Sequence, residues 1–360
     1  MKRVLEAATE YDAVELLHQS GSTDGLPVIV PTVNRVAAMI ARVDLDADLS
    51  LGEIGPKLGA ATIEKVAAAA VMAGCLPDHF PVVIAAIRLV CRNEFDITEV
   101  NQTTHCLAPL ILVNGPARTE CGPINSGAGI LGPGNRASAS IGRALSLVLI
   151  NIGGRQSGVT DMAVFSTPGK FTACLAEAEE LSPFDSYHQS IGFHKEESVV
   201  TIIGVEAPHS LILEPIGDVE KDALRLLQCI AAVIANPASN HVYRAGEGGM
   251  VVVLNPEHAM ILHKAGYNRK SVQLAIQSYA YISREYADSL FSGLNFVHKD
   301  DTDKLYAVRD AEQIMLVVAG GMGSYSMVLP SWAYAPHGNQ PLSKKFDVYP
   351  YCDTPIKPIS

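Results

Sequence analysis

Apolar residues recur at helical spacing in several stretches of the chain. VNRVAAMIARV (33–43) shows this spacing and predicts a short helix. TIEKVAAAAVMAG (62–74) predicts a strong helix. Gly74 is a typical C-cap for this helix, and Pro77 opens the next one, so that Cys75 lies in the joint of a helical hairpin. By the same reasoning, helices are predicted at 33–43, 62–74, 78–91, 136–150, 219–235 and within 256–290.

Short, continuous apolar runs separate these helices. LAPLILVNG (107–115) ends at Asn-Gly, which is typical of a buried strand. Further strands are predicted at 198–207, 250–255 and 314–320. The alternation of helices and strands predicts an α/β fold with a mixed or partly parallel sheet flanked by helices.

The order of these elements suggests two lobes. The expected division is an N-terminal α/β lobe with the helical hairpin and a glycine-rich loop (1–160), a connecting loop region (161–198), a C-terminal α/β lobe (199–345) and a tail (346–360). Residues 152–198 contain Gly, Ser, Pro and acidic side chains with little periodicity, which indicates a long functional loop or a lobe boundary.

Composition narrows the classes of partner. The 360 residues are 48% hydrophobic and 18% charged, with a net charge of -11. This balance argues against disorder and against nucleic-acid binding, and every apolar stretch is too short to span a membrane. We therefore expect a cytoplasmic protein with no membrane partner, and a homo-oligomer because the surface charge is modest. Seven scattered cysteines without a C-x-x-C pair indicate reduced thiols.

The segment INSGAGILGPGNRASASIGR (124–143) contains G-x-G-x-x-G, the pattern of a dinucleotide loop. However, the preceding strand ends twelve residues before Gly127, and no acidic residue follows at the required place, so NAD is not expected. Asn135 is instead an N-cap, and Arg136, Ser140 and Arg143 lie on one face of the helix after it. Two guanidinium groups beside a hydroxyl predict a site for a carboxylate or phosphate.

Asn125, Ser126 and Asn135 would orient a substrate at this anion site. The alternative is that the glycines only form a tight turn and that both arginines bind carbonyl or acidic groups elsewhere in the fold.

Thiol and imidazole groups suggest the chemistry. Cys75 precedes a helix N-terminus that could lower its pKa and make it a nucleophile or a redox thiol, with His105 as acid or base and His258 as a further catalytic group. The alternatives are that Cys75 is a buried structural thiol, or that a divalent metal is bound. In the metal hypothesis, the ligand and base residues are His105, His209, Glu257 and His258.

Several stretches together resemble the bacterial UGSC (seleno)protein family, named for a Sec-Gly-Ser-Cys motif. They are DGLPVIVPTVNRVAAMI, GAATIEKVAAAAVMAGCLPDHFPVVIAA, TTHCLAPLILVNGP, INSGAGILGPGNRASASIGRAL, NPEHAMILHKAGYNRKSV and VVAGGMGSYSM, and they cover most of residues 24–327. The resemblance implies a shared α/β architecture and a site near Cys75, His105, Asn125, Asn135, Arg136 and His258.

This chain departs from the family pattern because it has neither C-G-S-C nor C-x-x-C. It would therefore need a redox partner protein carrying a thiol or selenol pair, or perform chemistry that needs no such pair. The expected function is that of a thiol-dependent oxidoreductase or lyase, or of the substrate-binding subunit of one, acting on a small anionic organic molecule. The alternatives are a metal-dependent lyase or hydratase and a non-catalytic scaffold subunit.

Overall fold

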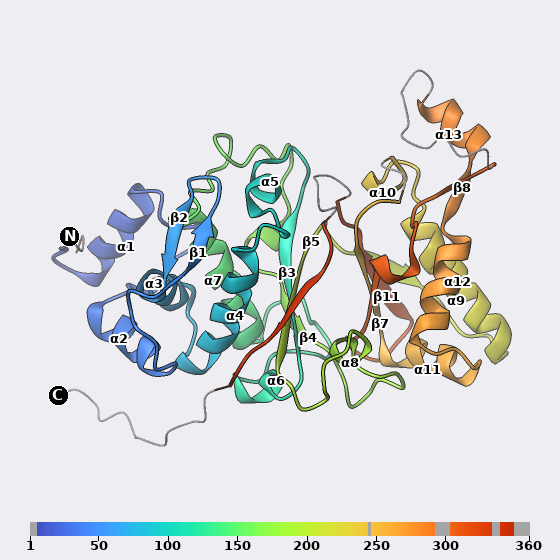
Figure 1. Cartoon of the computed structure of the whole chain (residues 1–360), viewed down its shortest axis with the longest axis horizontal. Helices are drawn as coiled ribbons and strands as arrows, with labels where there is room; N and C mark the ends of the chain where they lie inside the picture. Colours follow the sequence, from blue (N-terminus) through green and yellow to red (C-terminus); the bar gives the residue numbers. More distant parts are fainter. Residues whose placement is uncertain (1–5, 244–245, 292–302, 333–338, 349–360) are drawn as a thin grey trace.

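The chain folds into four layers, with two β-sheets packed face to face between two layers of helices (Figure 1). The computed structural model describes residues 6–243, 246–291, 303–332 and 339–348. The predicted α/β class, with a mixed sheet flanked by helices, is confirmed. Most of the expected tail lies outside the described residues.

The helices are α1 (Glu10–Gln19), α2 (Val33–Ala41), α3 (Ile63–Ala73), α4 (Phe80–Val90), α5 (Ile97–Gln102), α6 (Ala117–Glu120), α7 (Arg136–Asn151), α8 (Tyr187–Ser190), α9 (Val219–Ile234), α10 (Asn240–Tyr243), α11 (Pro256–Lys264), α12 (Arg269–Tyr279) and α13 (Arg284–Phe291), with 3-10 turns η1 (Pro77–His79), η2 (Pro168–Lys170) and η3 (Ala311–Gln313). The strands are β1 (Ser50–Ile54), β2 (Gly59–Thr62), β3 (Ala108–Asn114), β4 (Cys174–Ala176), β5 (Val199–Val205), β6 (His209–Ile212), β7 (Met250–Leu254), β8 (Tyr281–Ser283), β9 (Lys304–Tyr306), β10 (Ile314–Val318), β11 (Tyr325–Leu329) and β12 (Leu342–Lys345). No helix in the described ranges combines the length and the apolar character needed to cross a bilayer.

The two large sheets have the same topology. In the first, β3 pairs in parallel with β4 and antiparallel with β5, and β5 pairs antiparallel with β12. In the second, β7 pairs in parallel with β10 and antiparallel with β11, and β11 pairs antiparallel with β6. Each parallel pair is joined through helices, α7 in the first sheet and α11 with α12 in the second, as parallel strands require.

The edge strands are exchanged between the two halves. After β5 the chain crosses to form the edge strand β6 of the second sheet, and after β11 it returns to form the edge strand β12 of the first. The boundary expected at residue 199 therefore does not coincide with the sheets, because β5 and β12 both belong to the first one. The connecting region 161–198 contains η2, β4 and α8.

Alternating side chains of each central strand face different layers. On β3, Ile111 and Val113 contact the helical core of the first half, whereas Leu110 and Leu112 face the second sheet. On β7, Val252 faces the helices of the second half. Because both faces of each sheet are buried, these strands are apolar at nearly every position, which explains why the sequence shows them as continuous apolar runs.

The predicted helix boundaries follow from capping. Gly74 has φ +89° and caps α3, as the sequence predicted, because glycine adopts this left-handed conformation without steric cost. The Oδ1 atoms of Asn135 and Asn255 accept the N–H groups of Ser138 and His258 at 2.8 and 2.7 Å, so both side chains are N-caps, as predicted for Asn135. The region 256–290 contains the short strand β8 as well as helices.

A buried carboxyl group joins the two halves. Glu177, which follows β4, is fully buried. Its Oε2 accepts hydrogen bonds from Asn114 Nδ2 and the Tyr187 N–H, both at 2.7 Å. Its Oε1 accepts from Arg269 Nη2 of α12 at 3.2 Å and from the Val318 N–H of β10 at 3.4 Å. One side chain therefore takes donors from both sheets.

We expect Glu177→Ala to lower the free energy of unfolding by about 3–5 kcal/mol, because it leaves the Arg269 guanidinium buried without its partner. Urea denaturation followed by circular dichroism measures this change. Glu177→Gln keeps one acceptor oxygen for these donors, so we expect it to lower the free energy of unfolding by less than Glu177→Ala does. Glu180→Ala is the control, because Glu180 is exposed and pairs with Arg118 at the surface. It should change the free energy of unfolding by less than about 1 kcal/mol. Equal effects of the two alanine variants would contradict this role for Glu177.

Candidate functional site

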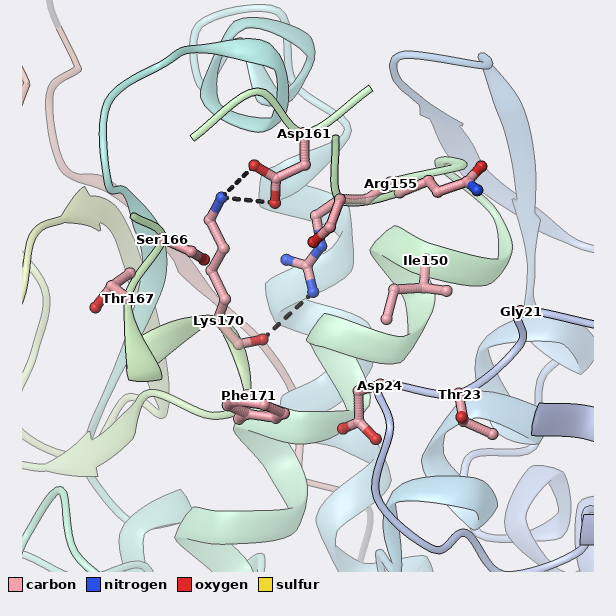
Figure 2. Close-up of a pocket in the computed structure, with 12 residues that line it drawn as sticks. Gly21, Thr23, Asp24, Ile150, Arg155, Asp161, Ser166, Thr167, Lys170 and Phe171 are labelled. Atoms are coloured by element: carbon pink, nitrogen blue, oxygen red, sulfur yellow. Dashed lines mark hydrogen bonds and ion pairs between the residues drawn. The ribbon is translucent and has the colours of Figure 1, made fainter. Parts of the chain in front are cut away.

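The candidate site is a cavity of about 310 Å³ at the C-terminal end of α7 (Figure 2). Three segments of the chain form it: the turn before α2, the last turn of α7 and the loop between α7 and β4. Its lining residues are Gly21, Thr23, Asp24, Ile150, Arg155, Gln156, Ser157, Asp161, Ser166, Thr167, Lys170 and Phe171. Most of them come from the non-periodic segment 152–198.

The end of α7 positions Arg155. The backbone N–H of Arg155 donates to Leu149 O at 2.9 Å, so the chain turns sharply where the helix stops. The guanidinium Nη2 then donates to Ser146 Oγ of α7 at 2.6 Å and to Lys170 O at 3.3 Å. Ser146 Oγ in turn donates to Lys170 O. These contacts hold the guanidinium group between the helix and the loop.

Arg155 is buried but has no carboxylate partner. Only 8% of the residue is exposed, and among the described residues its hydrogen bonds go only to a hydroxyl and a carbonyl oxygen, both through Nη2. Burial lowers the pKa of Arg155, while the nearby charges of Asp161 and Asp24 act in the opposite direction. An arginine stays protonated even so. The cavity therefore contains a positive charge whose Nε and Nη1 donors are left for a ligand.

Asp161 and Lys170 form a buried ion pair beside this guanidinium (Figure 2). Lys170 Nζ lies 2.7 Å from both carboxyl oxygens of Asp161. The loop is closed by the Gly158 N–H, which donates to Asp161 O at 2.9 Å. Burial lowers the pKa of Lys170, and Asp161 opposes this shift. Lys170 is thus a titratable amine that the fold brings next to the cavity.

Asp24 on the opposite wall is neutralised by Arg143. Nε and Nη2 of Arg143 each donate to one carboxyl oxygen of Asp24 at 2.8 Å, and Nη2 also donates to Pro27 O at 2.9 Å. Burial raises the pKa of Asp24, but the hydrogen bond and charge of Arg143 outweigh it, so that the pKa lies below its ordinary value. These hydrogen bonds hold the turn before α2, which contains Asp24, against α7.

The anion site expected on the first turns of α7 stays a prediction, but both of its arginines bind acidic or carbonyl groups of the protein, as in the alternative interpretation. Arg143 donates to Asp24 through Nε and Nη2, and Arg136 Nε donates to Gly74 O, the cap of α3, at 3.1 Å. Ser140 is buried, and its Oγ lies 3.1 Å from His79 Nδ1. The small residues of α7 allow another segment of the chain to pack closely against the helix. A Cβ on Gly142 would lie 2.4 Å from Thr172 Oγ1.

Asn125, Ser126 and Asn135 hold the glycine-rich loop together. Asn125 Oδ1 accepts the Gly127 N–H at 3.0 Å, and Asn135 Nδ2 donates to Pro123 O at 2.7 Å. Ser126 O accepts the Gly320 N–H at 2.8 Å, so this loop packs against the glycine-containing segment that follows β10. These contacts stabilise the loop. The prediction that these three residues bind a substrate is not tested by them.

The expected activation of Cys75 is wrong. The thiol is buried between α3 and α7, where Sγ donates to Ser140 O at 3.3 Å. Burial raises the pKa of Cys75 to about 12, although the Ser140 hydrogen bond and the charge of Arg136 act to lower it. Desolvation of the thiolate outweighs both of these effects. Cys75 matches the alternative interpretation, a buried structural thiol.

The residues of the metal hypothesis do not come together. His105, which precedes β3, has its Nε2 2.8 Å from Oε1 of Glu206, which follows β5. His258 is buried in the second half, where Nδ1 contacts Ser326 Oγ at 2.7 Å and Nε2 contacts Leu213 O at 3.3 Å. Glu257 Oε2 accepts the Gly323 N–H. In the described part of the chain, no group of three His, Cys, Asp or Glu residues is placed to hold a metal ion.

The residues that line the cavity were not predicted individually. Arg155, Asp161 and Lys170 lie in a segment without periodicity, so the sequence indicated a functional loop but not which side chains meet. The signal that could have indicated Arg155 is the sequence GGRQSG (153–158), which follows the helix predicted at 136–150. A glycine-rich turn at this place lets the arginine side chain fold back onto the end of the helix.

Burial disfavours the charged form of three histidines. His241 is 1% exposed, and its Nε2 accepts the Ser331 N–H at 2.9 Å. Burial is the main cause that lowers the pKa of His241 to about 4, and it likewise lowers that of His79 to about 4 and that of His258. In the unfolded chain each would take up a proton near its ordinary pKa of about 6.5.

We expect Cys75 to resist alkylation in the folded protein. At pH 8, a thiol with its pKa raised to about 12 forms on the order of a thousandfold less thiolate than an ordinary cysteine. Iodoacetamide labelling followed by peptide mass mapping, with and without urea, measures this protection. Labelling of Cys75 in the native protein as fast as in urea would show that it is accessible and activated.

We expect the stability of the protein to fall as the pH drops from 6.5 towards 4. The unfolded state protonates first, so stability present above pH 6.5 is lost on acidification, by about 2 kcal/mol at pH 5 for His241 alone. Urea denaturation at pH 7.5 and pH 5 should show a smaller difference in His241→Asn, whatever its absolute stability. The exposed His18→Asn is the control, and an unchanged difference in His241→Asn would refute the assignment.

Comparison of the chain with protein-family models, with curated proteins and with solved structures finds no match. The resemblance to the UGSC family therefore stays a prediction, and the functional argument rests on the geometry of the Arg155 cavity.

Proposed function

We propose that this protein is an enzyme, or the substrate-binding subunit of one, that binds a small anionic organic molecule in the Arg155 cavity. The observation that carries the proposal is a guanidinium group that is buried, opens onto a cavity and has no carboxylate partner among the described residues. A buried charge is costly unless it is paired. An anionic ligand would supply the missing partner.

The surroundings of Arg155 support binding. The hydroxyl-bearing residues Thr23, Ser157, Ser166 and Thr167 line the same cavity. Ser166 has φ +62°, a conformation that non-glycine residues rarely adopt and that occurs more often at functional sites. A few polar groups that converge on a concave site are typical of small-molecule binding.

Lys170 is the group that we propose for proton transfer. Its ammonium group is held by Asp161 at 2.7 Å, and burial moves its pKa below the ordinary value. A lysine with a lowered pKa exchanges a proton more readily near neutral pH. Arg155 would bind the anionic group while Lys170 gives a proton to the bound molecule or takes one from it.

The other functional hypotheses are affected unequally. The burial of Cys75 removes the basis for thiol chemistry at that residue, and the separate positions of His105 and His258 remove the basis for the expected metal site. A redox partner protein, a homo-oligomer and a cytoplasmic location stay proposals. So does the non-catalytic scaffold, which would not need a ligand at Arg155.

We expect Arg155→Gln to weaken binding of a small organic anion by about 10- to 100-fold, because it removes a charged hydrogen bond worth about 1.5–3 kcal/mol. A panel of carboxylates and phosphate esters is screened by ligand-observed NMR, and affinities are then measured by calorimetry. Arg155→Lys, which keeps the charge, should retain part of the affinity.

Arg136→Gln is the matched comparison, because Arg136 belongs to the site that the sequence predicts on α7. Loss of binding in Arg136→Gln and not in Arg155→Gln would move the site to the start of α7. If the unmodified protein bound no anion of the panel, the proposed function would be wrong.

A further inference from the structure

The charges around the Arg155 cavity leave a surplus of one positive charge. Asp161 is paired with Lys170, and Asp24 is paired with Arg143 through two hydrogen bonds. Arg155 is the charged lining residue that remains without such a pair among the described residues. A ligand with one negative charge would balance the cavity. A doubly charged group would leave one negative charge uncompensated beside Asp24 and Asp161, which is unfavourable in a partly buried site.

The cavity also has an apolar wall. Ile150 of α7 and Phe171, which follows Lys170 in the loop, line it together with the hydroxyl-bearing residues (Figure 2). Phe171 is 44% exposed, so part of its ring surface is not covered by protein. An aromatic or aliphatic ligand body would cover it and gain the free energy of removing apolar surface from water.

The size of the cavity limits the ligand. A cavity of about 310 Å³ lies at the lower end of the range typical of small-molecule sites, and a molecule of about ten non-hydrogen atoms fits it.

From the charge, the apolar wall and the size of the cavity we infer that it takes a small monocarboxylate with an apolar body, such as an arylcarboxylate or a branched-chain acid. This inference rests on the proposed function, since it specifies the anion that Arg155 would bind. The carboxylate would accept hydrogen bonds from Nε or Nη1 of Arg155 and from the hydroxyl groups of Ser157 and Ser166. The hydrocarbon part would lie against Phe171 and Ile150.

Three probes test the inference on the full-length protein by calorimetry at pH 8. Benzoate carries one charge and an aromatic body, phenyl phosphate carries two charges on the same body, and acetate carries one charge without the body. We expect benzoate to bind at least tenfold more tightly than either of the others. Arg155→Gln should weaken benzoate and acetate alike.

Phe171→Ala separates the charge from the apolar wall. It should reduce the affinity for benzoate about fivefold or more and leave that for acetate unchanged. Phe165→Ala is the matched control, because this phenylalanine is 89% exposed and does not line the cavity. It should leave both affinities unchanged.

Each failure has a distinct meaning. Tighter binding of phenyl phosphate would overturn the charge argument but keep the proposed anion site. Equal affinity for benzoate and acetate, or no effect of Phe171→Ala on the affinity for benzoate, would contradict the inference that the ligand has an apolar body. If none of the three probes bound but another anion of the panel did, the substrate class would be wrong. If no anion bound at all, the proposed function itself would fail.

Discussion

The structure depends on the buried carboxyl group of Glu177. Its two oxygens take donors from Asn114 and Tyr187 on one side and from Arg269 and Val318 on the other, so the two sheets must be in place together for all of these bonds to form. The cost of burying this charge is offset only when every donor is present. The carboxyl group therefore sets how one half lies on the other.

The exchange of edge strands reinforces the same constraint. Because β6 completes the second sheet and β12 completes the first, the second sheet needs the first crossing of the chain between the halves, and the first sheet needs the second crossing. The shared apolar layer, with Leu110 and Leu112 facing Val251 and Val253, then excludes water from the interface. The equivalent strand to β3 is β7, and both carry an asparagine at or just after their C-terminal end, Asn114 and Asn255.

Helix α7 carries the candidate site, but at the opposite end from the one that the sequence predicts. The expected anion lies at the N-terminus, where the helix dipole is positive. The structure instead puts Arg155 beside the C-terminal turn, where the dipole is negative and stabilises a cation. Anion binding there would depend on the guanidinium group alone. The arginine at the middle of the helix, Arg143, serves to hold the N-terminal turn through Asp24.

Local signals in the amino-acid chain were enough to predict most of the longer helices and the four strands β3, β5, β7 and β10. Gly74, Asn135 and Asn255 act as caps through contacts within a few residues, and the buried strands need apolar side chains on both faces wherever they lie. The lack of periodicity within 152–198 indicated a long functional loop or a lobe boundary, without deciding between them. Which side chains meet depends instead on the packed fold. Arg155 contacts Ser146 and Lys170, and Asp24 binds Arg143, which lies 119 residues away in the chain. The pKa of Cys75 depends on the packed fold too, because burial outweighs the hydrogen bond to Ser140 and the charge of Arg136. Contacts and desolvation of this kind arise from the packing of distant segments, which no local pattern encodes.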